Sequence, residues 1–145
     1  MTSKHIGVEL RSLNNAIVRF MSRFANKKYI DKMTNRNGWI IGYLARHQDQ
    51  DVFQRDLEQE FGITRSTASR VINLMVKKGL IEHCPVENDA RLKKLVLTPK
   101  ALEISVLMQA DGKQMEDKLS AGFSPEELET FFSFIERMKQ NIANE

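Results

Sequence analysis

The sequence predicts a mostly α-helical fold that carries one small β-hairpin. Apolar residues recur at steps of three and four in several segments, which is the pattern of helices that bury one side. A single pair of short runs, at 80–84 and 93–97, flanks a polar stretch and predicts two strands joined by a turn. With 145 residues, of which 41% are hydrophobic and 28% charged, the chain is long and apolar enough to bury one core.

The first predicted helix covers residues 6–24. Its apolar side comprises Ile6, Leu10, Leu13, Ile17, Met21 and Phe24. A second helix is expected to begin near Thr34 or Asn35, because both are good N-cap residues. Its inward side chains are expected to be Trp39, Ile40, Tyr43 and Leu44. The polar residues 47–51 then predict a loop.

Two shorter segments predict a pair of helices joined by a tight turn. The first covers 54–61 and is expected to end at Gly62, since glycine tolerates the left-handed conformation of a helix end. Thr64 is the expected N-cap of the second helix, which covers 65–79 and ends at Gly79. Two helices at this separation have the spacing of a helix-turn-helix.

Two more helices are expected toward the C-terminus. Thr98 is a cap followed by proline at the first helical position, and it predicts a long helix that reaches about Leu119. Ser124 and Glu127 have the spacing of a capping box. The final helix carries an apolar side made of Leu128, Phe131, Phe132, Ile135, Met138 and Ile142. The chain is therefore expected to contain about six helices.

The helix predicted at 65–79 separates polar from apolar side chains. At 100° per residue, polar residues lie within about 60° of Ser66, namely Ser69, Arg70, Asn73 and Lys77. The opposite side carries Ala68, Val71, Ile72 and Met75. Hydroxyl, amide and guanidinium groups bond base edges and phosphates in a major groove. An ordinary amphipathic helix with a solvated polar side shows the same pattern, so the segment that follows decides between the two interpretations.

The predicted hairpin directly after this helix favours a winged helix. Arg91 is the candidate for its tip, where arginine would contact the sugar-phosphate backbone or enter the narrow minor groove. Asp89 is placed to orient the Arg91 guanidinium through a charge-assisted bond, and Lys93 and Lys94 add possible phosphate contacts. The candidate DNA contacts are therefore Arg65, Ser66, Thr67, Ser69, Arg70, Asn73, Lys77, Asp89, Arg91 and Lys93.

Charge is unevenly distributed along the chain. The net charge is +3, but residues 1–48 carry +7, residues 62–98 carry +4 and residues 99–145 carry −4. A polyanion would therefore meet the first two thirds of the chain.

Other functional classes find little support in the sequence. No apolar run approaches the roughly 18 residues of a membrane span, and the first residues lack the apolar stretch of a signal peptide, so we expect a cytoplasmic protein without membrane contact. His5, His47 and His83 are scattered, and no nucleotide-binding or nucleophile motif is present, so no enzyme, metal or cofactor is expected. The single cysteine, Cys84, is more simply a packed thiol than a redox sensor.

Four stretches resemble the MarR family of regulators. They are Asp56-Leu57, Gly62 through Arg70, Leu74 through Ile81, and Asn88 through Arg91 with Leu97-Thr98. The resemblance implies a homodimer in which intertwined terminal helices hold one winged helix over each half of a pseudo-palindromic site. It also implies regulation by a small ligand, or by oxidation in some branches, that alters the spacing between the two DNA-binding lobes. The redox-sensing branch carries its reactive cysteine near the N-terminus, unlike Cys84.

We therefore expect one protomer over residues 1–145. A winged helix-turn-helix lobe with a two- or three-stranded wing would cover about 34–98, and helical regions at about 5–30 and 99–142 would form the dimer. The expected function is a sequence-specific regulator, with repression as its mode. Its partners would be double-stranded DNA, a second copy and a small aromatic or anionic effector. The alternative is a winged-helix module that docks a protein, or coats DNA without sequence preference.

Four aromatic residues are candidates for an effector cleft between the helical base and the winged lobe. They are Phe20, Phe24, Trp39 and Tyr43. Large aromatic side chains also fill cores, and core packing is the favoured interpretation of all four.

Overall fold

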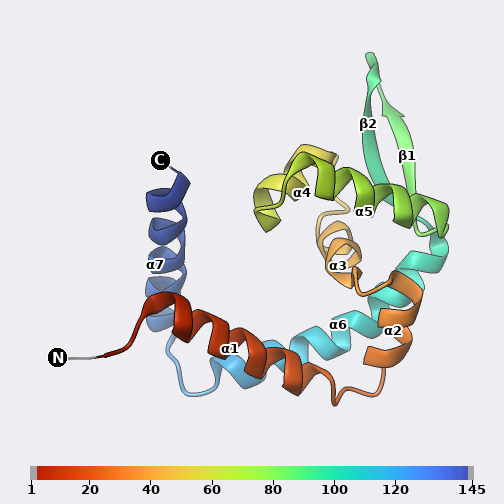
Figure 1. Cartoon of the computed structure of the whole chain (residues 1–145). Coiled ribbons are helices and arrows are strands. Elements are labelled where there is room, and N and C mark those ends of the chain that lie inside the picture. The colour runs from red at the N-terminus through yellow and green to blue at the C-terminus, as the bar shows by residue number, and fades with distance from the viewer. Residues whose placement is uncertain (1–2, 144–145) are drawn as a thin grey trace. The chain divides into compact units, whose positions relative to one another are not determined.

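Figure 1 shows a computed structural model of the chain, which describes residues 3–143. Within those residues there are seven helices and one two-stranded antiparallel sheet. The chain divides into two compact units, one up to Asp111 and the other from Gly112, and each is described by itself. In the part of the chain described, no helix is long and apolar enough to span a bilayer.

The elements follow one another with short connections. They are α1 (Ile6–Met21), α2 (Lys27–Thr34), α3 (Gly38–Arg46), α4 (Gln54–Phe61), α5 (Arg65–Lys77), β1 (Ile81–Val86), β2 (Asp89–Leu97), α6 (Pro99–Ser120) and α7 (Pro125–Ala143). The mostly helical class and the winged helix-turn-helix order are confirmed. The expected number of helices was one too small, because the sequence analysis missed α2.

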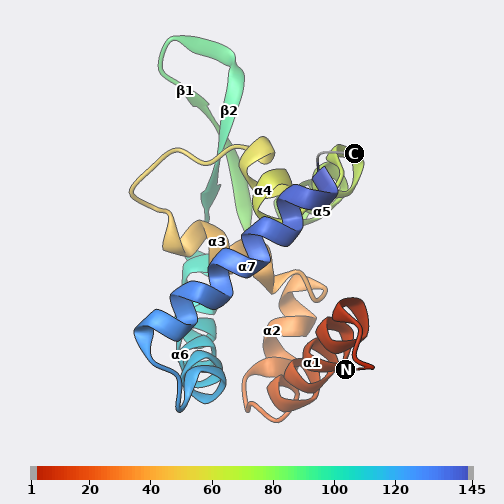
Figure 2. The same cartoon turned by 90° about the vertical axis from the view of Figure 1, so that its left-hand side faces the viewer.

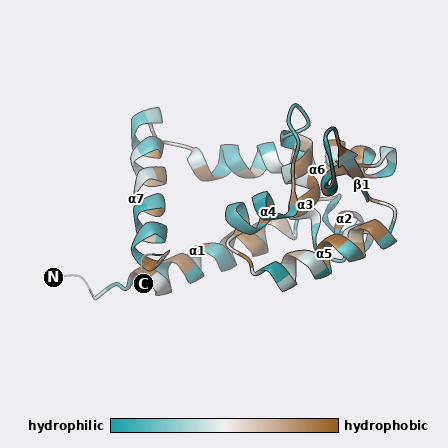
Figure 3. Cartoon of the chain, turned by 90° about the horizontal axis from the view of Figure 1, so that it is seen from above, coloured by the Kyte–Doolittle hydropathy of each residue, from teal (hydrophilic) through white to brown (hydrophobic). Residues whose placement is uncertain are grey.

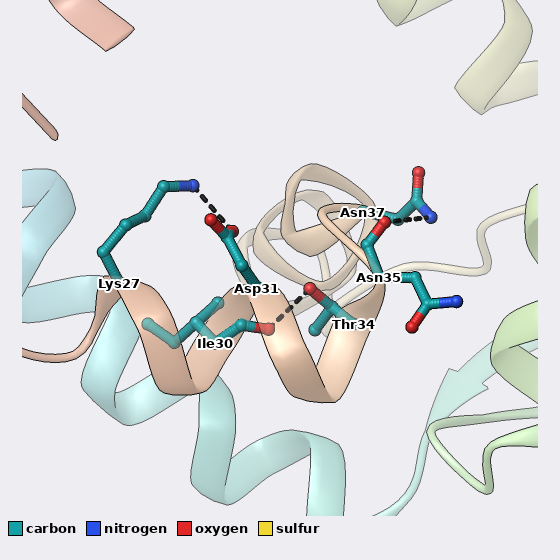
Figure 4. A network of polar contacts seen from close by, with 6 residues as sticks. All are labelled: Lys27, Ile30, Asp31, Thr34, Asn35 and Asn37. Carbon is teal, nitrogen blue, oxygen red and sulfur yellow. Dashed lines mark hydrogen bonds and ion pairs between the residues drawn. The ribbon is translucent and has the colours of Figure 1, made fainter. Parts of the chain in front are cut away.

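The structure corrects the predicted start of the second helix. Thr34 is the last residue of α2, where its hydroxyl donates a 2.7 Å hydrogen bond to the carbonyl of Ile30 (Figure 4). Asn35 and Arg36 follow with φ of 49° and 65°, in the left-handed region that ends helices. α3 therefore begins only at Gly38. The prediction was wrong because asparagine serves at both ends of a helix, as an N-cap and as a left-handed terminator.

The core of the first unit lies between α3, α4, α5, the base of the hairpin and the start of α6. Its fully buried members are Ile40, Ile41, Leu57, Ile72, Met75, Leu80, Ile81 and Ile104. The predicted inward residues Ile40, Tyr43 and Leu44 are buried, and Trp39 is half-buried. This shared core holds the helix pair and the hairpin in one body.

The helix-ending and capping signals formed where the sequence predicted them. Gly62 and Gly79 adopt positive φ of 60° and 76° after α4 and α5. The backbone N–H of Ala101 donates to the Thr98 hydroxyl at 3.3 Å, at the start of α6. The Ser124 hydroxyl accepts from the N–H of Glu127 at 3.1 Å and the Glu127 carboxylate accepts from the N–H of Ser124 at 2.8 Å, which completes the predicted capping box.

The hairpin is longer than predicted and extends away from α4 and α5 (Figures 1 and 2). β1 and β2 pair antiparallel, with Ile81 opposite Leu97 at the base. The N–H of Leu95 also donates to the carbonyl of Val52 at 2.8 Å, which attaches β2 to the loop before α4. Of the two or three strands expected, two form.

α1 and α7 expose much of their apolar side. Neither helix contains a buried residue. In α1 the side chains of Ile6, Leu10 and Leu13 are exposed, and in α7 those of Phe131, Phe132 and Ile142 are exposed. Apolar and polar residues alternate along α7 in Figure 3, which colours the chain by hydropathy.

Candidate nucleic-acid interface

The N-terminus of α5 is organised by three hydroxyl groups. The Thr64 hydroxyl accepts from the backbone N–H of Thr67 at 3.2 Å, as predicted for the N-cap. It also donates to the Thr67 hydroxyl at 3.0 Å and lies 3.2 Å from the Ser66 hydroxyl. A hydroxyl has one donor and two acceptor positions, so Ser66 and Thr67 keep unused hydrogen-bonding capacity for an external group. The sequence analysis did not predict that the Thr64 hydroxyl contacts the side chains of two candidate DNA contacts, Ser66 and Thr67.

α5 has the two sides that its sequence predicts. Ala68, Val71, Ile72 and Met75 are buried against the rest of the first unit. The exposed candidates are Arg65, Ser66, Arg70, Asn73 and Lys77, and the half-buried ones are Thr67 and Ser69. The side chains of Arg70, Asn73 and Lys77 make no hydrogen bond or ion pair within residues 3–143. This side of α5 therefore presents donor and acceptor groups that no internal partner occupies.

The first helix of the pair holds the start of the second. Gln54 Nε2 donates to the carbonyl of Arg65 at 3.3 Å and to Glu58 Oε2 at 3.2 Å. The Asp56 carboxylate accepts from the N–H of Phe53 at 2.8 Å and so caps α4. Of these bonds, the one from Gln54 to Arg65 joins α4 directly to the first turn of α5, where the candidate base contacts lie.

Arg55 is a candidate that the sequence analysis missed. Its side chain is exposed in the first turn of α4, with the guanidinium carbon 5.4 Å from the centre of the Phe53 ring. A cation held over an aromatic face keeps its charge accessible. The position was predictable, because the first helix of a helix-turn-helix crosses the DNA backbone.

The wing differs from the prediction at its tip. The turn consists of Glu87 and Asn88, with Asn88 at φ 74°, so Arg91 lies within β2 and not at the tip. The pairing shifts there, because Pro85 opposes Lys93 whereas Val86 opposes Asp89, which leaves residues 90–92 in a bulge. The sequence analysis placed the tip at 85–92 because the bulge carries polar residues that look like a turn.

Asp89 also acts differently from the prediction. Its carboxylate accepts a 2.9 Å hydrogen bond from the backbone N–H of Arg91, which is the local bond that aspartate makes two residues on. No ion pair joins Asp89 to the Arg91 guanidinium in the described chain. Asp89 therefore shapes the bulged backbone and leaves the guanidinium of Arg91 exposed and unpaired there.

The two lysines of the wing have different surroundings. Lys93 is exposed, whereas Lys94 Nζ lies 3.3 Å from Asp51 Oδ1 in the loop before α4. Lys94, one of the suggested phosphate contacts, is therefore already paired with a carboxylate of the same chain. Lys93 remains a candidate.

The aromatic candidates for an effector cleft pack on other aromatic rings. Trp39 and Tyr43 contact Phe61 of α4 at ring distances of 4.5 and 5.8 Å, and Tyr43 stacks on His47 at 4.1 Å. Phe20 lies edge to face with Phe24 at 5.5 Å. These contacts agree with the packing interpretation.

The surroundings of Tyr43 disfavour ionisation of its phenol. Burial raises the pKa of Tyr43, and the carboxylates of Asp56 and Glu60 raise it further. The phenol is therefore neutral near pH 7. In residues 3–143 no group of three or more histidine, cysteine, aspartate or glutamate side chains is arranged to hold a metal ion.

Comparisons with known proteins agree with this geometry. A model of the MarR family matches residues 32–92. An HTH-type transcriptional regulator of Bacillus subtilis, YybA, is 27% identical over 130 residues, which cover 89% of this chain and 85% of YybA.

Solved structures extend the likeness to nearly the whole chain. The transcription regulator MarR of Oenococcus oeni is 28% identical with a TM-score of 0.74, over 90% of this chain and 97% of its own. A MarR family regulator of Listeria monocytogenes, solved with a 26mer DNA, is 25% identical with a TM-score of 0.75, over 97% of this chain and 91% of its own. Regulators of this kind act by binding and are not enzymes. Residues 32–92 thus match the MarR family, and nearly the whole chain shares the winged helix-turn-helix fold of these transcriptional regulators.

Proposed function

We propose that the chain binds a pseudo-palindromic operator as a homodimer, with α5 in the major groove and the β1–β2 wing against the adjacent backbone. The observation that carries the proposal is the surface of α5, whose apolar side is buried while Arg70, Asn73 and Lys77 are exposed without internal partners. Arginine suits guanine and asparagine suits adenine at the edges of bases in this groove.

The candidate residues divide into base contacts and backbone contacts. Ser66, Ser69 and Arg70 lie near the start of α5, the part of such a helix that approaches base edges most closely. Asn73 is a further candidate for a base contact. The remaining candidates would contact phosphates or the minor groove, and they are Arg65, Thr67, Lys77, Arg91 and Lys93. Asp89 acts through the backbone of the wing.

The exposed terminal helices support the homodimer. Ile6 is 61% exposed and Phe132 is 60% exposed, although both lie on the apolar sides of their helices. Apolar surface of this extent marks an interaction site, and a second copy of the chain offers the same surface. Two lobes held in this way would meet half-sites about 34 Å apart.

Repression and regulation by a small molecule are further parts of the proposal. Such a dimer would repress by covering promoter DNA that polymerase needs. Because its ligand would be DNA, the protein would act in the cytoplasm. A small aromatic or anionic effector that favours a mismatched lobe spacing would weaken binding. A hundredfold loss of affinity needs a preference of about 2.7 kcal/mol for the unproductive state.

The test is selection of a site from a library of random duplexes, followed by salt titrations on the selected and a scrambled duplex. Tight binding to the selected duplex alone supports the regulator. Equal binding to both duplexes supports a DNA-coating protein, and no binding to either supports a protein-docking module.

A further inference from the structure

Thr98 is the residue at which three elements of the first unit meet. Its hydroxyl donates a 2.7 Å hydrogen bond to the carbonyl of Gly79 and accepts one of 3.3 Å from the N–H of Ala101. Its backbone N–H donates to the carbonyl of Leu80 at 3.1 Å. Thr98 thus touches the turn after α5, the base of the hairpin and the first turn of α6.

The bonds of Thr98 hold the hairpin against α5. Leu80 N–H in turn donates to the carbonyl of Met75 inside α5 at 2.9 Å, so the base of the hairpin is fastened to the end of that helix. A second attachment lies further along β2, where the N–H of Leu95 donates to the carbonyl of Val52 at 2.8 Å. A hairpin attached at two separate points keeps one angle to the helix, whereas a hairpin with one of them weakened can pivot.

The environment of the Thr98 side chain favours a persistent bond. The residue is 8% exposed, and water competes poorly for its hydroxyl at such a site. One hydroxyl serves as donor to the turn after α5 and as acceptor for α6, so its removal loosens both connections together.

We infer that Thr98 is a positioning residue, which fixes the angle between the wing and α5 so that both meet one half-site together. The inference rests on the proposed function. Because Thr98 is buried and its hydroxyl bonds within the protein, its loss should weaken binding to the preferred site more than binding to an unrelated duplex. Non-specific binding depends mainly on charge, which the substitution leaves unchanged.

Thr34 provides a matched control. It is also a buried threonine, 0% exposed, and its hydroxyl also donates a 2.7 Å bond, to the carbonyl of Ile30 (Figure 4). That bond lies within α2 and joins no two elements. Thr34→Val and Thr98→Val therefore remove similar bonds at similar burial, and they differ in whether the bond joins the wing to α5.

The experiment measures binding of the full chain to the duplex selected from the random library and to its scrambled version. We expect Thr98→Val to bind the selected duplex about five- to thirty-fold more weakly, the effect of one or two lost buried bonds, and the scrambled duplex almost as the wild type does. Thr34→Val should lower the melting temperature comparably and leave both affinities unchanged. Thr98→Ser, which keeps the hydroxyl, should restore selective binding.

Two outcomes overturn the inference while the proposed function stands. The first is equal binding of Thr98→Val and Thr34→Val to the selected duplex at matched fractions of folded protein. The second is binding by Thr98→Ser that is as weak as that by Thr98→Val. Should Thr98→Val fail to fold, Thr98→Ala carries the same expectation. A wild-type chain that selects no site overturns the proposed function, and the inference fails with it.

Discussion

Lys94 and Asp51 form an ion pair of 3.3 Å that joins the wing strand β2 to the loop before α4. The adjacent Lys93 is exposed and forms no ion pair within residues 3–143. Of these two consecutive lysines, Lys93 therefore has its full positive charge available to DNA phosphates, whereas the carboxylate of Asp51 partly offsets the charge of Lys94.

The first prediction concerns this pair of lysines. Lys93→Ala should weaken binding to all duplexes and lower the slope of log affinity against log salt by about one unit for each lost phosphate contact. Lys94→Ala should change the slope by less than half as much. An exposed ion pair contributes only about 0–1 kcal/mol to folding, so neither variant should unfold. Salt titrations on one duplex measure both effects, and equal slopes for the two variants would contradict the distinction.

The second prediction concerns the dimer. Phe132 is 60% exposed on the apolar side of α7, so Phe132→Glu places a charge on the proposed interface, where burial without a partner is costly. We expect a monomer by light scattering at micromolar concentration. Ser133→Glu adds the same charge at the next residue, which is also exposed, and serves as the control. A dimer that persists in Phe131→Glu/Phe132→Glu would show that α7 does not hold the two copies together.

The sequence predicted best those features that depend on neighbouring residues. The cap at Thr64, the left-handed Gly62 and the buried side of α5 follow from local chemistry and helical periodicity, and all three formed. The apolar side of α5 was therefore known before the structure, and with it the direction of Arg70 and Asn73.

The features that the sequence missed depend on contacts between distant residues or on ambiguous turn signals. α2 was missed because Thr34 and Asn35 looked like the start of a helix and are its end. Arg91 was misplaced because a bulge inside β2 has the same polar composition as a turn. The pairing of Lys94 with Asp51 has no local signal, since 43 residues separate the two.

The third prediction concerns Asp89, whose carboxylate accepts from the backbone N–H of Arg91 at 2.9 Å. Asp89→Asn keeps a carbonyl oxygen for that bond and should bind every duplex almost as the wild type does. Asp89→Ala loses the bond and should bind all duplexes more weakly, by about 0.5–1.5 kcal/mol, because the bulge that presents Arg91 is less ordered. If Asp89→Asn binds as poorly as Asp89→Ala, the charge matters and the backbone bond does not.

The last prediction separates base contacts from backbone contacts. Arg70 lies on the exposed side of α5, and Arg91 lies in the bulge of the wing. Arg70→Ala should cost about 1–3 kcal/mol on the selected site and relax the preference at one base pair in each half-site. Arg91→Ala should weaken all duplexes together and lower the salt slope by about one unit for each lost contact, while the major-groove preferences stay intact.

Binding of both variants to a randomised half-site library at two salt concentrations measures these effects together. A lost base contact changes which sequences are enriched. A lost phosphate contact lowers the affinity for all sequences, and the difference from the wild type becomes smaller at the higher salt concentration. Arg55→Ala adds a test of the missed position, and it should resemble Arg91→Ala because the first helix of the pair crosses the backbone. If Arg91→Ala binds as the wild type does and Arg70→Ala leaves every preference unchanged, α5 and the wing are not the DNA-binding surface. The alternative function, docking of a protein partner on the exposed polar side of α5, would then be favoured over the DNA-binding regulator.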